Sequence, residues 1–226
     1  MKDILISLKK VFFTLIVLLG PALILIFIST RGCKHMFKEL DYFGLAENYT
    51  FFDSKGNKHS TEEFKDYTVL INVLQPSCPY DCSISFHHFN HLIYQKMCHK
   101  SYEKGSLRII SFVTDGEGNP IKDISSVRQM LFDQVEDYDP KVWMVASGEP
   151  KKLFNFSKNN STLLKEGDEY YGGHAFQELM LLLDKKNNLR MVYRGNSEGL
   201  VRKMSESIAL LKKEYDKESV EHVKKK

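Results

Sequence analysis

Short apolar runs alternate with amphipathic stretches along most of this chain, and the alternation predicts its elements. Four apolar runs, at residues 68–74, 107–113, 141–145 and 179–183, are short enough for strands. The first of them is rich in β-branched side chains and has the length of a buried strand. A polar turn then leads into a fifth strand at 189–193. These runs predict the strands of a central sheet.

The segments between the strands show helical spacing. The longer predicted helices are at 81–99, 124–135 and 199–215. In the last of these, one face collects Leu200, Met204, Ile208, Leu211 and Tyr215. The shorter predicted features are a hairpin at 51–58, a helical turn at 61–65, a short helix at 150–156 and a polar loop at 157–168. The charged residues beyond Lys217 predict a frayed tail.

The order of these elements predicts an α/β fold. Alternating strands and helices favour a largely parallel sheet with helices packed on it, and the terminal hairpin adds antiparallel pairing. A strand followed by a cysteine pair that opens a helix, with a hairpin and helix at the end, is typical of the thioredoxin-like arrangement. We therefore expect a thioredoxin-like domain with a central mixed sheet flanked by helices.

The N-terminal region predicts a transmembrane helix ahead of this domain. Residues 11–28 contain no charge over eighteen positions, which is about enough to cross a bilayer. A cleaved signal peptide is the alternative, but the apolar run is long for one and no Ala-x-Ala site follows. Thr30-Arg31-Gly32-Cys33 resembles a lipoprotein cleavage site only faintly, because Arg31 fits it poorly.

The predicted organisation therefore has five parts. They are a basic segment at 1–10, a transmembrane anchor at 11–30, a linker at 31–48, the thioredoxin-like domain at 49–216 and a charged tail at 217–226. An anchored thiol-pair domain is expected outside the cytoplasm. The chain has no Arg- and Ser-rich transit peptide, which favours a bacterial inner-membrane protein over an organellar one.

Composition and charge narrow the range of partners. The formal net charge is only +3, which is too small to indicate nucleic-acid binding. Four cysteines are too few for a disulfide scaffold. The 42% of hydrophobic residues is enough for one globular domain, and we expect a monomer.

The pair Cys78 and Cys82 is the main chemical feature of the sequence. It directly follows the first strand, and Pro79 suits the first position of a helix. A helix N-terminus favours thiolates, and side chains four residues apart share a helical face. Such a pair binds a soft metal such as Cu(I) or closes into a disulfide. The alternative is two buried, inert cysteines.

A copper site with two thiolates calls for a third ligand, and imidazole suits copper. The strongest candidate is His174, which follows Gly172 and Gly173 in a loop just before the fourth strand. In a thioredoxin-like fold that loop lies beside the cysteine turn. Three other histidines have helical spacing, for which a solvated polar face is the preferred interpretation over a metal site: His87, His88 and His91.

These residues give the chain a resemblance to the Sco/SenC family. The cysteine turn at 77–82 resembles the family's Cys-Pro-x-x-Cys motif, and His174 stands where the family has its histidine. Supporting stretches are 110–115, 143–148 and 181–185. The resemblance implies a membrane-anchored, thioredoxin-fold copper chaperone that assists cytochrome c oxidase assembly. It implies that Cys78, Cys82 and His174 bind one copper ion, expected as Cu(I).

Three positions depart from the family pattern: Ser83, Gly116 and Gly173 replace a usual Pro, Pro and Asp. The departures leave the ligands in place but bring the role of a neighbouring acidic residue into question. Asp81 and Asp115 are secondary candidates, with a helix-start charge and a loop-shaping role as the simpler interpretations. Cys98 is expected to be a bystander, and Cys33 borders the membrane.

Three other functions remain to be compared with copper delivery. A thiol-disulfide oxidoreductase would use Cys78 and Cys82 as its catalytic pair to reduce an acceptor such as an oxidase subunit, and would not need His174. A peroxiredoxin-like peroxidase would need an arginine near the thiolate, and neither Arg108 nor Arg128 is close to the turn in sequence. A purely structural membrane protein does not explain the cysteine turn.

Overall fold

The computed structural model describes residues 13, 16–27, 39–76, 84–96, 107–154, 157–158, 161–162 and 175–224. The chain divides into two units, Met1–Lys38 and Glu39–Lys226. In the first unit, residues 16–27 form a helix whose large apolar side chains are mostly exposed. Among the helices in the described ranges, none combines the length and the apolar character needed to cross a bilayer.

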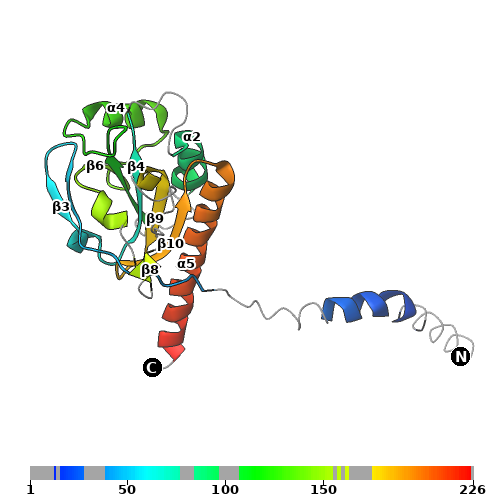
Figure 1. Ribbon diagram of the computed structural model, residues 1–226. Helices are drawn as coiled ribbons and strands as arrows, with labels where there is room; N and C mark the ends of the chain where they lie inside the picture. Colours follow the sequence, from blue (N-terminus) through cyan, green and yellow to red (C-terminus); the bar gives the residue numbers. More distant parts are fainter. Residues whose placement is uncertain are drawn as a thin grey trace, which may run out of the picture. The chain divides into compact units, whose positions relative to one another are not determined.

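The second unit is built on an eight-stranded sheet with the order β1-β10-β9-β4-β5-β6-β2-β3 (Figure 1). Its strands are β1 (Gly44–Leu45), β2 (Thr50–Asp53), β3 (Lys58–Ser60), β4 (Thr68–Leu74), β5 (Leu107–Val113), β6 (Trp143–Ser147), β9 (Leu179–Leu183) and β10 (Asn188–Arg194). β4, β5 and β6 are parallel, whereas β9 is antiparallel to β4, and β10 to β9. The predicted mixed sheet is confirmed.

The central strands are apolar along their whole length because both faces of the sheet are covered. All seven residues of β4 are buried. Leu70 and Leu74 belong to the core on one face, while Val69, Ile71 and Val73 belong to the core on the other. A strand buried on both sides needs a continuous apolar run rather than alternation. This is why the sequence predicts the bounds of β4, β5 and β9 correctly.

Different elements cover the two faces of the sheet. One face packs against α2 (Phe86–Phe89), the π-helical η2 (Asn90–Gln95), α4 (Ser125–Gln134) and α5 (Glu198–Lys224). The core on the other face is completed by η1 (Thr61–Phe64), η3 (Lys151–Phe154) and η4 (Ala175–Glu178), and it includes Phe51 of β2, a strand of the sheet itself. The sheet is thus the middle layer of the unit, as the thioredoxin-like arrangement requires.

The structure differs from the sequence predictions at several points. In the described residues, the helix predicted from 81 begins only at Phe86, because the backbone of Ser85 is extended. α5 continues to Lys224, so the frayed tail expected after Lys217 is wrong. Val201 is fully buried on α5, whereas Leu200 is only partly buried. Part of the expected loop at 157–168 forms a small ladder of β7 (Ser157–Lys158) and β8 (Ser161–Thr162). The helix extends because Lys, Glu and Val tolerate a helical backbone once a packed face has started it.

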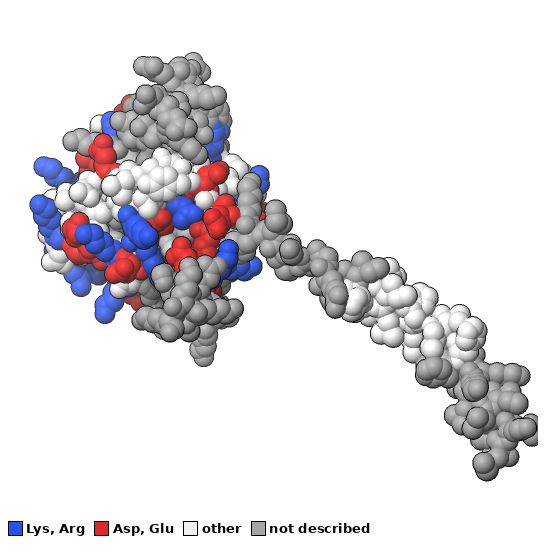
Figure 2. All heavy atoms as spheres, turned by 90° about the horizontal axis from the view of Figure 1, so that it is seen from below, with Lys and Arg blue, Asp and Glu red and all other residues white. Residues whose placement is uncertain are grey.

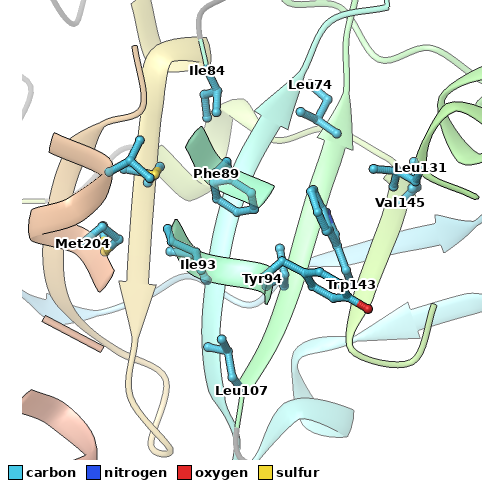
Figure 3. Close-up of a cluster of buried hydrophobic side chains, with 14 of the residues drawn as sticks. Leu74, Ile84, Phe89, Ile93, Tyr94, Leu107, Leu131, Trp143, Val145 and Met204 are labelled. Atoms are coloured by element: carbon cyan, nitrogen blue, oxygen red, sulfur yellow. The ribbon is translucent and has the colours of Figure 1, made fainter. Parts of the chain in front are cut away.

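The core on the helical face is centred on Trp143 (Figure 3). The indole is fully buried, and its ring centroid lies 5.1 Å from that of Phe89 and 5.2 Å from that of Tyr94. Its Nε1 donates a hydrogen bond of 2.8 Å to Ser111 Oγ, which donates in turn to Asn72 Oδ1. These bonds satisfy the one polar atom of a large buried ring.

The outer surface of the second unit mixes charges of both signs. On the face drawn in Figure 2, basic and acidic side chains lie interspersed. Exposed ion pairs on the unit include Lys65 with Glu62 and Arg202 with Glu198. Among the described residues, this face therefore carries no continuous basic stripe of the kind that nucleic-acid-binding surfaces present.

Replacing His59 with glutamine is expected to destabilise the protein more at pH 6 than at pH 9. Burial opposes the imidazolium, but contacts with Glu63 (2.7 Å) and Asp53 (3.4 Å) outweigh it and raise the pKa of His59 above its usual value. Because the pKa of His59 is higher in the folded than in the unfolded state, the protonated histidine stabilises the fold. This stabilisation is complete below the unfolded-state pKa of about 6.5 and disappears as pH rises through the folded-state pKa. Melting temperatures of wild type and variant at both pH values check this, and an equal difference at both would contradict it.

Candidate metal-binding site

The described residues next to the predicted ligands in sequence lie at one end of the central strands. β4 and β5 are parallel and in register, with Leu74 opposite Val113, so both end at this edge. β9 is antiparallel to β4 and therefore begins there. The candidate residues that lie outside the described part of the chain are Cys33, Cys78, Asp81, Cys82, Cys98 and His174.

Gln177 joins the ends of these segments through its side-chain amide. Its oxygen accepts hydrogen bonds from Gln75 Nε2 and from Thr114 Oγ1, the latter at 2.6 Å. Its nitrogen donates to the backbone oxygen of Gly116 at 3.2 Å. Gln177 is 2% exposed and Thr114 is fully buried. Gln75 stands three residues before Cys78, and Gln177 three residues after His174.

The loop after β5 packs against Gln177 and is closed by Asp115. The Asp115 carboxylate accepts from the backbone nitrogens of Glu117 (2.9 Å) and Asn119 (2.8 Å) and from Asn119 Nδ2 (3.0 Å). Hydrogen bonds from Asn119 lower the pKa of Asp115 below its usual value. All of these bonds stay within the loop, so the loop-shaping role of Asp115 accounts for its described contacts.

A second connection ties the start of α2 to the hairpin of β9 and β10. The backbone nitrogen of Gly195 donates to Glu178 O (2.7 Å), and Ser85 N donates to Gly195 O (2.9 Å). Burial raises the pKa of Glu178, whose Oε2 lies 3.7 Å from Arg194 Nε and accepts from Asn196 Nδ2 at 3.3 Å. The first residues described after the cysteine turn are therefore hydrogen-bonded to the end of the sheet at which η4 leads into β9.

Two of the three helical histidines, His87 and His91, lie exposed on one face of their helix. The rings of His87 and His91 stack with centroids 6.2 Å apart, and both residues are exposed. Within the described ranges, no three His, Cys, Asp or Glu side chains come together in a way that could bind a metal. The preferred interpretation, a solvated polar face, agrees with this arrangement.

The two arginines considered for peroxidase chemistry are engaged elsewhere. The Arg108 guanidinium lies 4.1 Å from the ring centroid of Tyr67, at the end of β5 where Val69 is its partner. That end is separated from Gln75 by most of β4, about 20 Å of strand. Arg128 lies over the ring of Phe132 at 5.2 Å. Arg108 therefore lies at the opposite end of β4 from the residues that lead into the cysteine turn.

Sequence reasoning missed Gln75, Gln177 and Glu178. The available signal was the placement of glutamines next to apolar strands: Gln75 directly follows β4, and Gln177 lies two residues before β9. A buried amide must find partners, so a glutamine at a strand end is a candidate for joining loops. The sequence does not show that the two glutamines, 102 positions apart, contact each other.

No protein-family model matches the chain, and no curated protein is a detectable relative. Solved structures do match it. BsSco, a member of the Sco family of cytochrome c oxidase assembly proteins in which a disulfide switch was identified, shares 17% identity over 75% of this chain and 97% of its own, with a TM-score of 0.51. A candidate electron transport protein from Aquifex aeolicus VF5 shares 14% over 76% and 98%, with a TM-score of 0.52.

The fold is one that Sco proteins have. This agrees with the thioredoxin-like domain predicted from the sequence. The soluble domain of Sco1 from Bacillus subtilis is also similar, with 19% identity over 78% of this chain and 99% of its own and a TM-score of 0.47. At these identities the likeness concerns the fold, and the ligand set of Cys78, Cys82 and His174 stays a prediction.

Proposed function

We propose that the protein is a membrane-anchored copper chaperone in which Cys78, Cys82 and His174 bind one Cu(I). The observation that carries the proposal is the hydrogen bond between Gln75 and Gln177. Three residues of chain span at most about 11 Å, which limits how far Cys78 lies from Gln75 and His174 from Gln177. The hydrogen bond between Gln75 and Gln177 therefore supports a site in which two thiolates and one imidazole meet.

Delivery of copper would proceed by ligand exchange. The ion keeps its oxidation state while acceptor thiols lose protons and bind it, and the Cys78 and Cys82 thiolates become free to take up protons. The proposed acceptor is the subunit with the dinuclear copper site of cytochrome c oxidase. This choice is supported by the resemblance of the cysteine turn to the Sco/SenC family and by the fold shared with BsSco, a member of a family of oxidase assembly proteins.

The proposed location is the bacterial inner membrane, with the domain outside the cytoplasm and residues 11–30 as the anchor. The uncharged run at 11–28 and the exposed apolar side chains of the helix at 16–27 support an anchor. Removing residues 1–38 is expected to shift the protein from the membrane fraction to the soluble fraction. Protease added to spheroplasts should then digest the domain of the full-length protein, and protection of that domain would contradict the proposed orientation.

Titration of the reduced full-length chain with Cu(I) tests the ligand set. Wild type is expected to bind one equivalent, Cys78→Ser and Cys82→Ser to lose tight binding, and His174→Ala to bind at least about tenfold more weakly. Cys98→Ser is the matched control, because it removes a thiol outside the proposed set and should bind like wild type. Unchanged stoichiometry and affinity in the three ligand variants would remove the copper function.

A thiol-disulfide oxidoreductase is the second candidate, and the disulfide switch identified in BsSco favours considering it. In this reaction the Cys78 and Cys82 thiols form a disulfide while an acceptor disulfide gains two electrons and two protons. His174 has no part in it. Exchange with a model disulfide peptide should therefore be unchanged in His174→Ala if this is the function, whereas copper binding in the same variant should fall only if the chaperone role holds.

A further inference from the structure

Gln177 is held in one position by groups from three segments. Its amide satisfies both its oxygen and its nitrogen with Gln75, Thr114 and Gly116, as described above. The loop after β5 passes close to Phe176 and Gln177: a Cβ on Gly118 would lie 2.8 Å from Phe176 Cε1, too close for a side chain, and 3.5 Å from Gln177 Nε2. Gly118 has φ +77, a conformation that suits glycine. The buried amide of Gln177 is therefore enclosed by residues from three segments of the chain.

We infer that Gln177 is a positioning residue for the copper site. It fixes the start of β9, which the His174 segment precedes, against the end of β4, which the cysteine turn follows. The inference rests on the proposed function, because it supposes that Cys78, Cys82 and His174 are the ligands. Residues that orient metal ligands typically change metal affinity 10–100-fold when they are replaced. Gln177 acts through His174 and does not touch the metal itself.

The effect can be measured as a Cu(I) dissociation constant in competition with a chromophoric Cu(I) chelator, using the reduced full-length chain. Gln177→Leu is expected to weaken binding about tenfold. Thr114→Val removes only one of the three hydrogen bonds and adds no volume, so it should weaken binding less and in the same direction. Ser111→Ala is the matched control: it removes buried hydrogen bonds to Asn72 and Trp143 in the core, and should bind copper like wild type.

A double-mutant cycle with His174→Ala separates positioning from a general loss of stability. If Gln177 acts through the imidazole, Gln177→Leu should change the dissociation constant less than about twofold once His174 is already alanine. A full tenfold loss in that background, or an equal loss in Ser111→Ala, would overturn the positioning role. Wild-type affinity in Gln177→Leu, with binding still dependent on the three ligands, would overturn this inference alone. Copper binding that does not depend on those ligands would overturn the proposed function as well.

Discussion

Replacing Trp143 with alanine is expected to lower the free energy of unfolding by about 3–5 kcal/mol. The indole is fully buried and packs against Phe89 and Tyr94, so its removal leaves a cavity that these rings fill only in part. The change also deprives Ser111 Oγ of the hydrogen bond that it accepts from the indole. Cavity formation and the lost bond act in the same direction, which makes this one of the largest effects expected in the protein.

Urea denaturation of wild type, Trp143→Ala and Trp143→Phe checks this prediction. Phenylalanine keeps most of the ring volume but lacks the Nε1–H group, so it is expected to cost about 1–2 kcal/mol. Because both variants lack the Nε1–H group, the difference between their free energies of unfolding measures the cost of the larger cavity. A cost below about 1 kcal/mol for alanine would mean that the surrounding side chains close the space, contrary to the dense core described here.

Replacing Arg190 with methionine is expected to destabilise the second unit by about 3 kcal/mol. The guanidinium donates to Glu214 Oε2 (2.7 Å), Leu40 O (3.0 Å) and Asp41 O (3.1 Å), and lies 3.5 Å from Asp184 Oδ2. Glu214 also accepts from Leu40 N at 2.6 Å. The side chains of Arg190, Asp184 and Glu214 are 14%, 9% and 10% exposed, so methionine would leave two largely buried carboxylates without their cation.

The double variant Arg190→Met with Glu214→Leu tests the cause of this loss. It removes one of the uncompensated carboxylates and is expected to be more stable than Arg190→Met alone. Arg190→Lys keeps the charge without the planar fork and should fall between wild type and methionine. Urea midpoints measure all three. A double variant less stable than the single one would show that the hydrogen bond from Leu40 N to Glu214, and not the uncompensated charge of Glu214, dominates.

The sheet could be predicted closely because its central strands are buried on both faces. β4, β5 and β9 begin and end where their apolar runs do, because strands covered on both faces are apolar along most of their length. β6 begins at Trp143, two residues later than predicted, because the nitrogens of Val142 and Trp143 bond to Asp139 O in a turn. The π-helical η2 within the predicted helix at 81–99 has no signal in the side-chain spacing.

The candidate site was less accessible to sequence reasoning. Cys78, Cys82 and His174 are predicted from their chemistry and from the family resemblance, and they lie outside the described residues. The contact between Gln75 and Gln177 depends on the antiparallel placement of β9 beside β4. Which distant strands pair depends on the packing of the whole unit, so a local sequence pattern does not predict this contact.

The central claim is that two sulfurs and one imidazole bind a single copper ion. X-ray absorption at the copper edge, on the reduced full-length chain loaded with one equivalent of Cu(I), tests it most directly. We expect two sulfur and one nitrogen neighbours in wild type, and loss of the imidazole signal in His174→Ala. A copper coordination shell without sulfur, or a coordination shell that is identical in wild type and His174→Ala, would contradict the account.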